Sequence, residues 1–288
     1  MKWRFITEGW ELNMRVDFYT SDFKLIDIRN LGVETNDFIV SSPSPQHERE
    51  AVKGQHGTNT LGTTLDGRTM RVSFYIMAYD LYDYYLTRNA VYKLFNGLDF
   101  MYIVDRREPG KRWAKVRVNS SYEMTRINPT TSTFDIEFMS DYAFSESIGS
   151  TEDSFTDDDD VIWQYGQGLP DEPVSYEQTA ANFQYYNAGD VMIDPRKYPL
   201  QIEVTAAQTS DDIYMSLSNL TTGEDWTYRG PTIAGQKYIL DGVQTLLGGA
   251  SVSMKTNFGL ISLKPGYNNI SRNSGISKVK FINRFYYF

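Results

Sequence analysis

The residue types that most often perform acid–base or metal chemistry are scarce in this chain and poorly spaced for it. Its two histidines, His47 and His56, stand nine residues apart in a segment rich in Gly and Pro. The residues around them do not have the spacing that is typical of metal ligands. No Gly-x-Ser-x-Gly sequence presents a serine nucleophile. The absence of cysteine excludes thiol catalysis, disulfides and Cys-ligated zinc. We therefore expect no catalytic, cofactor or metal site.

Acidic residues are numerous, but no pattern among them defines a reaction centre. The run 157–160 holds four consecutive aspartates, whereas a Ca²⁺ loop takes its ligands from alternating positions around a glycine. A glycosidase needs two carboxylates at a set separation, and no motif singles out such a pair. Gly54, Gly57, Gly62 and Gly67 lack both the spacing of a phosphate loop and a following Lys-Ser/Thr. The sequence predicts that the protein is not an enzyme.

The net charge of −9 argues against nucleic acid as a partner. Most of the excess lies in residues 151–288, which carry 17 Asp+Glu against 10 Lys+Arg. An acidic surface repels phosphate backbones, so specific binding is not expected, although an acidic channel through which DNA slides remains compatible.

One basic cluster resembles a nucleic-acid patch but is interrupted by Glu108, Pro109 and Gly110. That interruption predicts an exposed hairpin turn whose charged flanks pair with acidic groups on a neighbouring subunit. The cluster comprises Arg106, Arg107, Lys111, Arg112, Lys115 and Arg117.

Composition favours a strand-rich protein. The hydrophobic fraction of 41% can build real cores, and the 21 Tyr and 16 Phe favour strands and protein interfaces. No apolar run approaches the ~18–20 residues of a membrane helix, and the first residues lack the apolar stretch of a secretory signal. We expect no membrane insertion.

Hydrophobic periodicity predicts the elements. Apolar and polar residues alternate as in half-buried strands. These strands are expected at 10–18, 71–76 and 133–138, with shorter candidates at 100–104 and 114–118.

One segment changes to helical spacing. Apolar residues at Leu81, Tyr84, Tyr85, Val91, Tyr92 and Phe95 predict a helix over 81–96. Asp80 is a suitable N-cap and Gly97 a suitable stop.

Composition shifts divide the chain. Residues 1–145 are expected to form a first domain from which a long Gly/Pro-rich arm, 41–67, reaches a neighbouring subunit. Residues 146–173 are expected to be a linker or loops, because they combine like charges with Gly and Pro. Residues 174–288 resume as short strands with turns and predict a β-sandwich.

Exposed aromatics leave an alternative function open. Trp163, Trp226 and Tyr228 are candidates for stacking on sugars, in which case the chain would be a carbohydrate-binding module that attaches to the host wall.

Three stretches of the sequence indicate more than the fold class that hydrophobic patterning predicts. The first is Gly54–Gly57 followed by Asp66–Phe74 and the helix; the second is Phe134–Phe138 followed by Asp141–Phe144. The third runs from Tyr186–Asp190 and Tyr198–Ile202 to Leu263–Ile270, a Leu-x-Pro-Gly-x-Asn-x-Ile sequence, and a terminal strand that ends on aromatics. In order and spacing they resemble the distal tail protein family of siphophages, although the usual Asp-Pro-aromatic is here Asp-Tyr-Ala-Phe.

The resemblance implies a mainly β fold with two domains. The first would be a tail-tube-like β-sandwich or barrel with one helix, and the second a galectin-like β-sandwich. Six copies would form a ring at the tail tip of the virion, assembled in the bacterial cytoplasm. This ring would be a structural hub that contacts the tail-tube protein, the tape-measure protein and the tail-tip or receptor-binding proteins.

Overall fold

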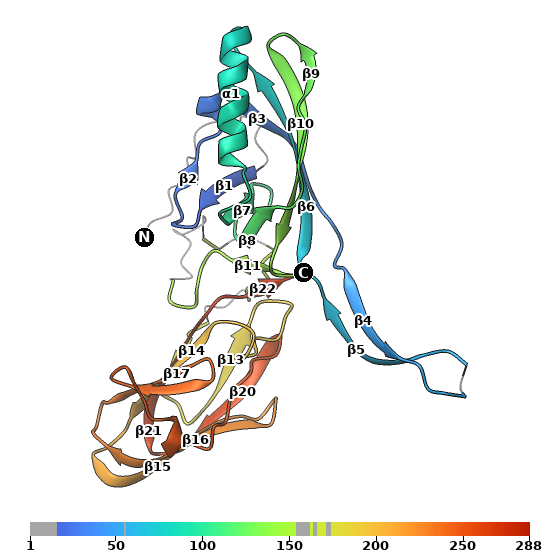
Figure 1. The fold of residues 1–288 in the computed structure, drawn as a ribbon. Coiled ribbons are helices and arrows are strands. Elements are labelled where there is room, and N and C mark those ends of the chain that lie inside the picture. The colour runs from blue at the N-terminus through green and yellow to red at the C-terminus, as the bar shows by residue number, and fades with distance from the viewer. Residues whose placement is uncertain (1–15, 55, 154–161, 164–165, 171–173) are drawn as a thin grey trace. The chain divides into compact units, whose positions relative to one another are not determined.

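The protein is described by a computed structural model that covers residues 16–54, 56–153, 162–163, 166–170 and 174–288 (Figure 1). The chain divides into two compact units, Met1–Ser145 with Phe288, and Glu146–Tyr287. The predicted strand residues 10–15 and the aspartate run 157–160 lie outside the described residues.

Unit 1 is built on one antiparallel sheet whose strand order is β2-β1-β7-β8-β10-β6-β3, with β9 paired to β10. Strands predicted at 71–76, 133–138, 100–104 and 114–118 are confirmed within β6, β10, β7 and β8. The strands are β1 (Val16–Thr20), β2 (Leu25–Ile26), β3 (Val33–Val40), β6 (Arg68–Met77), β7 (Met101–Asp105), β8 (Lys111–Val118), β9 (Thr125–Asn128) and β10 (Thr131–Ser140). A short 3-10 helix, η1 (Arg29–Leu31), precedes β3.

The sheet curls around its own core. Phe18 of β1 lies 5.9 Å, ring to ring, from Phe74 of β6, although three strands separate β1 and β6 in the sheet. Phe95, at the end of the helix, packs 5.3 Å from Phe18 and fills the same space. The edge strands β2 and β3 do not pair, so the predicted sandwich or barrel is an open, curled sheet and not a closed barrel.

Helix α1 (Leu81–Leu94) confirms the one predicted helix. The Asp80 carboxylate caps it by accepting the N–H of Asp83 at 2.8 Å, and Gly97 follows in the left-handed region at φ +76°. Its buried residues are Tyr84, Thr87 and Val91. The predicted apolar face is therefore only partly used for packing in unit 1.

The arm is a hairpin with its own two-stranded ladder. Strands β4 (Pro45–Glu50) and β5 (Asn59–Leu65) pair only with each other, and every residue except Leu65 is exposed (Figure 1). At its root, the N–H of Asp66 donates to the carbonyl of Ser44 at 2.9 Å. A Cβ at Gly67 would lie only 2.4 Å from the carbonyl oxygen of Ser140.

Unit 2 contains two antiparallel sheets packed face to face. Tyr185 lies 4.8 Å, ring to ring, from Phe281 of the opposite sheet, and Tyr228 lies 4.7 Å from Tyr238. One sheet has the order β12-β21-β14-β17-β18-β19 and the other β13-β20-β15-β16. The strands are β12 (Glu177–Gln178), β13 (Asn182–Asn187), β14 (Leu200–Ala206), β15 (Ser210–Asn219), β16 (Glu224–Thr232), β17 (Lys237–Asp241), β18 (Gln244–Leu247), β19 (Ala250–Ser251), β20 (Gly266–Arg272) and β21 (Ile276–Asn283). Strand β11 (Ser145–Ser147) pairs with β22 (Tyr286–Tyr287), and a short 3-10 helix, η3 (Ser253–Lys255), follows β19.

The first residues of the segment expected to be a linker are hydrogen-bonded within unit 2. The Thr151 hydroxyl donates to the carbonyl of Phe281 at 2.7 Å and accepts the N–H of Asn283 at 3.1 Å. This part of 146–173 therefore borders the sheet as an ordered loop.

Candidate interaction surfaces

The histidines lie on the arm and not in a catalytic cleft. The Nδ1 atom of His47 is 2.9 Å from the hydroxyl of Thr63 across the β4–β5 ladder, and His56 is in the turn. Within the described residues, no group of three or more His, Asp or Glu side chains is arranged to hold a metal ion.

The basic cluster forms ion pairs inside the chain. The turn between β7 and β8 is an exposed hairpin, as expected, with Arg107 about half exposed. The acids that pair with its cations come from unit 1 itself, and pairing with a neighbouring subunit stays a prediction. The pairs are Arg106–Asp17 at 2.9 Å, Arg107–Asp105 at 2.7 Å, Arg117–Asp141 at 2.9 Å and Lys111–Glu108 at 3.7 Å.

The remaining two cations of the basic cluster contact aromatic rings. The Arg112 guanidinium, only 4% exposed, lies 4.8 Å from the Phe23 ring and 4.7 Å from the Tyr102 ring. The Lys115 ammonium lies 5.1 Å from the Tyr142 ring. All six cations of the cluster therefore have a partner within the chain.

The aromatics considered for sugar stacking are mostly core residues. Trp226 is fully buried and Tyr228 is 1% exposed. The Trp226 indole N–H donates to the hydroxyl of Thr245 at 3.0 Å, which satisfies its polar group inside the sandwich. Trp163 is half-buried. Trp226 and Tyr228 therefore cannot stack on a sugar, because no face of either ring reaches solvent.

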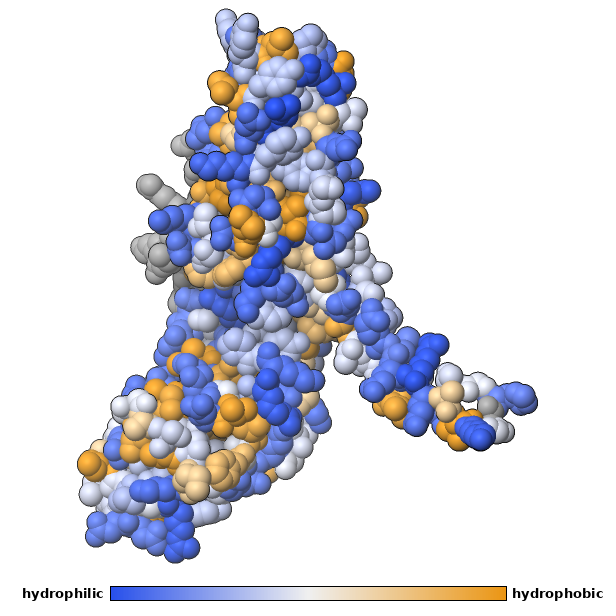
Figure 2. All heavy atoms as spheres, viewed as in Figure 1, coloured by the Kyte–Doolittle hydropathy of each residue, from blue (hydrophilic) through white to orange (hydrophobic). Residues whose placement is uncertain are grey.

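Large exposed side chains gather at the end of unit 1 where α1 begins, and Figure 2 shows orange spheres interspersed with blue ones there. The Arg126 guanidinium of β9 lies 4.5 Å from the Tyr84 ring and 5.3 Å from the Tyr85 ring, which joins β9 to the helix. Five large side chains there are 65–94% exposed, and such patches mark interaction sites. We call them the helix-end patch: Met77, Tyr79, Tyr82, Leu86 and Ile127.

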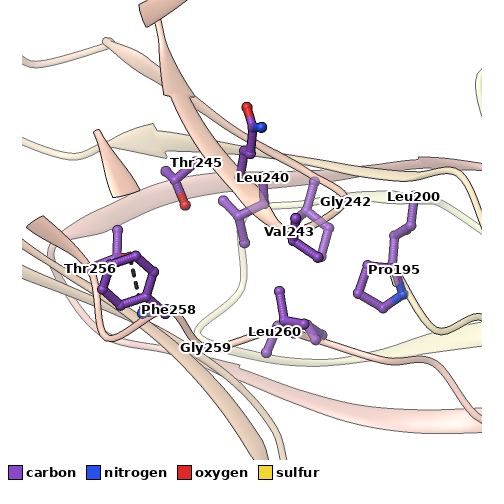
Figure 3. Close-up of a pocket in the computed structure, with 13 residues that line it drawn as sticks. Pro195, Leu200, Leu240, Gly242, Val243, Thr245, Thr256, Phe258, Gly259 and Leu260 are labelled. Atoms are coloured by element: carbon purple, nitrogen blue, oxygen red, sulfur yellow. Dashed lines mark hydrogen bonds between the residues drawn. The ribbon is translucent and has the colours of Figure 1, made fainter. Parts of the chain in front are cut away.

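Unit 2 has a shallow apolar cleft beside an aromatic on a strained loop (Figure 3). Phe258 is 61% exposed and takes φ +55°, which is unusual for a bulky residue. The Asn257 side chain accepts the N–H of Thr227 at 3.0 Å, and a Cβ at Gly259 would lie only 1.8 Å from the carbonyl of Asp225. The loop is thus pinned to β16. The lining includes Pro195, Leu200, Leu240, Val243, Phe258 and Leu260.

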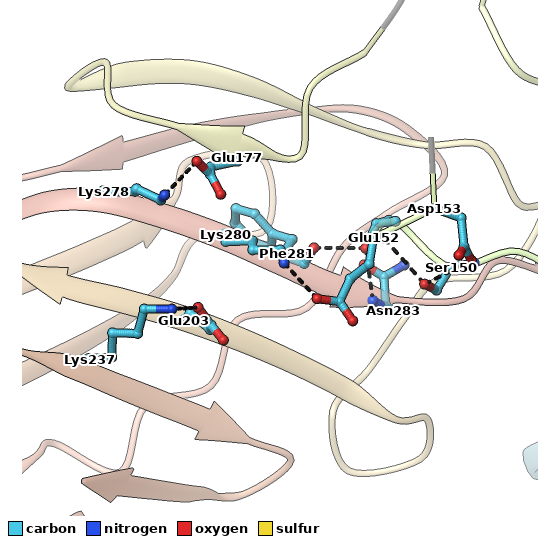
Figure 4. A network of polar contacts seen from close by, with 11 residues as sticks. Ser150, Glu152, Asp153, Glu177, Glu203, Lys237, Lys278, Lys280, Phe281 and Asn283 are labelled. Carbon is cyan, nitrogen blue, oxygen red and sulfur yellow. Dashed lines mark hydrogen bonds and ion pairs between the residues drawn. The ribbon is translucent and has the colours of Figure 1, made fainter. Parts of the chain in front are cut away.

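The outer face of the six-stranded sheet carries balanced ion pairs (Figure 4). The Lys278 ammonium lowers the pKa of the Glu177 carboxyl, and the Glu152 carboxylate raises the pKa of Lys280. Paired charges of both signs give this face no net attraction for an ionic partner. The pairs are Lys237–Glu203 at 2.9 Å, Lys278–Glu177 at 2.5 Å and Lys280–Glu152 at 2.6 Å.

Comparison with known proteins identifies the first unit. Residues 26–140 match the family model of the phage tail protein RIFT-related domain. This part of unit 1 therefore resembles the phage tail protein RIFT-related domain. No curated protein matches the chain by sequence.

The whole chain has the fold of a siphophage distal tail protein. The crystal structure of the SPP1 phage Dit protein (gp 19.1) has a TM-score of 0.66 at 12% identity, covering 94% of this chain and 99% of that chain. That protein is described as a paradigm of the hub adsorption apparatus in phages that infect Gram-positive bacteria. Phage p2 baseplate structures, in the activated conformation with Sr or Ca, cover 94% of this chain and 97% of theirs at 8% identity, with TM-scores of 0.41 and 0.39.

Neither the helix-end patch nor the cleft beside Phe258 could be predicted from the sequence. Exposed apolar side chains on α1 have the same spacing as buried ones, and Phe258 lies outside any alternating run.

None of the helices in the described part of the chain has the length and apolar character to cross a membrane.

Proposed function

We propose that the protein is the structural hub of a siphophage tail tip, a ring that joins the tail tube to the receptor-binding apparatus. The observation that carries this function is a fully exposed hairpin on a phage tail RIFT-related domain. A two-stranded hairpin is at best marginally stable in water, so its ladder needs a surface outside the subunit. A second copy supplies that surface, and head-to-tail contacts of this kind close into rings.

The two units then have different roles. Residues 1–145 form the ring. The arm contacts the next copy, and the helix-end patch contacts the tail-tube or tape-measure protein. The loops of 146–173 lead into residues 174–288, a galectin-like sandwich without catalytic activity. The tail-tip or receptor-binding protein packs on the exposed apolar side chains at the rim of the cleft in this sandwich, because Phe258 and Val243 are 61% and 58% exposed there.

The ring is tested by measuring mass and shape. Light scattering and electron microscopy of the purified chain should give closed rings of six copies of the 33.1 kDa subunit. Replacing residues 45–65 with Asn-Gly should leave monomers, because it removes the arm while keeping the sheet. A wild-type chain that stays monomeric at all concentrations, or rings that persist without the arm, would contradict the proposal.

Docking on unit 2 needs a separate test. Phe258→Asp should abolish binding of the tail-tip protein in a pull-down with assembled rings, whereas Met254→Asp, a change of an 87% exposed side chain outside the cleft, should not. Equal binding by both variants would place the docking site elsewhere.

A further inference from the structure

The two strands of the arm have different outer edges. Strand β4 begins with Pro45 and then carries four ionisable side chains, His47, Glu48, Arg49 and Glu50. Strand β5 has no charged side chain among its seven residues, three of which are threonines. Proline and charged side chains protect a strand edge from pairing with another chain, whereas threonine favours strands. The edge of β5 is therefore the side of the arm that is suited to pair with a further strand.

The register of the arm shows which backbone groups point to its outer edges. The backbone hydrogen bond at the root of the arm lies next to the pair formed by Pro45 and Leu65. Hydrogen-bonded and non-hydrogen-bonded pairs alternate along an antiparallel ladder, so Pro45–Leu65 is a non-hydrogen-bonded pair. His47–Thr63, two positions further along, is another. The backbone N–H and C=O groups of these residues therefore point away from the partner strand, and on β4 the missing N–H of Pro45 costs no ladder bond.

Four backbone groups on the outer edge of β5 have no partner within the described residues. They are the N–H and C=O groups of Thr63 and Leu65, since β5 pairs only with β4 and no other described residue bonds to them. Thr63 is exposed and Leu65 is partly exposed, so a strand from outside the subunit can reach both. The bulge at Leu61 ends this regular stretch of edge. A strand that pairs here would extend the ladder from two strands to three, which a hairpin needs for stability.

We propose that the outer edge of β5 pairs with an edge strand of a second copy, so that the arm joins the sheet of the next subunit through backbone hydrogen bonds. The pairing rests on the proposed ring and names the surface that closes it. A second copy suits this edge because the sheet of unit 1 is open at both ends, at β2 and β3, and every copy then carries a strand to donate and edges that can receive one. Since donated and receiving strands differ, the contact is head-to-tail and repeats around a ring, whereas pairing of β5 with β5 would stop at a dimer.

The first experiment compares the two edges of the same hairpin. Thr63→Pro removes an outward N–H from β5, and His47→Pro, directly opposite, removes one from β4 and is the matched control. Neither change breaks a ladder hydrogen bond, and both remove the same side-chain contact between His47 and Thr63. In sedimentation of the full chain, Thr63→Pro should weaken association at least about 10-fold, because an acceptor on the receiving strand loses its donor, whereas His47→Pro should associate as the wild type does. Equal association of the two variants, or a loss in His47→Pro alone, would overturn the assignment.

Hydrogen exchange resolved to single amides tests the pairing in the unchanged chain. In assembled rings, the N–H groups of Thr63 and Leu65 should exchange at least about 10-fold more slowly than in the dilute subunit, while that of His47 should exchange equally fast in both. The receiving strand is the one whose outward N–H groups slow down in the same rings. Rings in which the β5 edge gains no protection, or protected dimers in place of rings, would contradict the pairing. Failure of the wild type to associate at all would instead contradict the proposed function.

Discussion

The arm and the β15–β16 hairpin are the same backbone motif with opposite surroundings. Both are antiparallel two-stranded ladders. In β15 every second residue from Ile213 to Asn219 is buried, including Leu217, and in β16 Trp226 and Tyr228 are buried, whereas β4 and β5 bury none. The ladder alone therefore does not determine how firmly a hairpin is held. Burial of one face against another layer gives β15–β16 its stability, whereas no layer covers the arm within the described residues.

The largest effect is expected at Trp226. Trp226→Ala should lower the free energy of unfolding of unit 2 by about 3–5 kcal/mol, because it removes a fully buried indole and leaves a cavity. Leu61→Ala, at the exposed bulge of the arm, should change it by less than about 0.5 kcal/mol. Urea unfolding followed by far-UV circular dichroism measures both. Similar losses in the two variants would remove the distinction between the hairpins.

A smaller loss is expected from the polar contact of the same ring. Thr245→Val should cost about 1–2 kcal/mol, since the Trp226 indole N–H then has no acceptor in a buried place. Thr245→Ser keeps the hydroxyl and should recover much of the loss. Thermal unfolding of the three proteins tests this, and an unchanged midpoint for Thr245→Val would show that the bond contributes nothing.

Charges on the outer face of unit 2 should contribute less still. Lys278 lowers the pKa of Glu177, so the stabilisation from this pair is present above the ordinary carboxylate pKa and is lost as pH falls through the lowered value. Both side chains are more than a third exposed, so screening limits the effect to less than about 1 kcal/mol. The difference in unfolding free energy between wild type and Lys278→Met should shrink from pH 7 to pH 3. A difference that grows on acidification would reverse the sign.

The smallest effect on the isolated subunit is expected from removing the arm. Ser44 and Asp66 are already joined by a backbone hydrogen bond, so an Asn-Gly turn in place of residues 45–65 should close the ladder without strain. The unfolding free energy of the monomer should change by less than about 0.5 kcal/mol. A clear loss would mean that the arm supports its own subunit, and the comparison with β15–β16 would fail.

Local pattern predicted the strands and the helix because these follow from side-chain periodicity. It could not predict which apolar residues find a partner: Tyr84 and Tyr82 are both aromatic residues of α1, but one is 2% and the other 81% exposed. The same limit applies to Trp226, whose position on a strand suits a core and a sugar platform equally.

The partners in the ion pairs could not be predicted from the sequence for a different reason. Arg106 and Asp17 are 89 residues apart and meet only because β1 and β7 are neighbours in the sheet. The charge cluster could be seen, but its partners depend on strand order. The opposite case is Arg68. That its Nε and Nη1 atoms have no hydrogen-bond partner becomes visible only once its burial is known.

The close approach at Gly67 has a mechanical consequence. With a Cβ excluded by the Ser140 carbonyl 2.4 Å away on one side, and Pro43 and Pro45 restricting φ on the other, both strands leave the sheet along restricted paths. The hairpin is then held in a restricted orientation and does not move as a flexible loop. In the ring that we propose, every copy would then present its tip in a similar direction before contact, so less conformational entropy would be lost when two copies meet. Gly67, Pro43 and Pro45 would in this way limit how far the arms of different copies diverge.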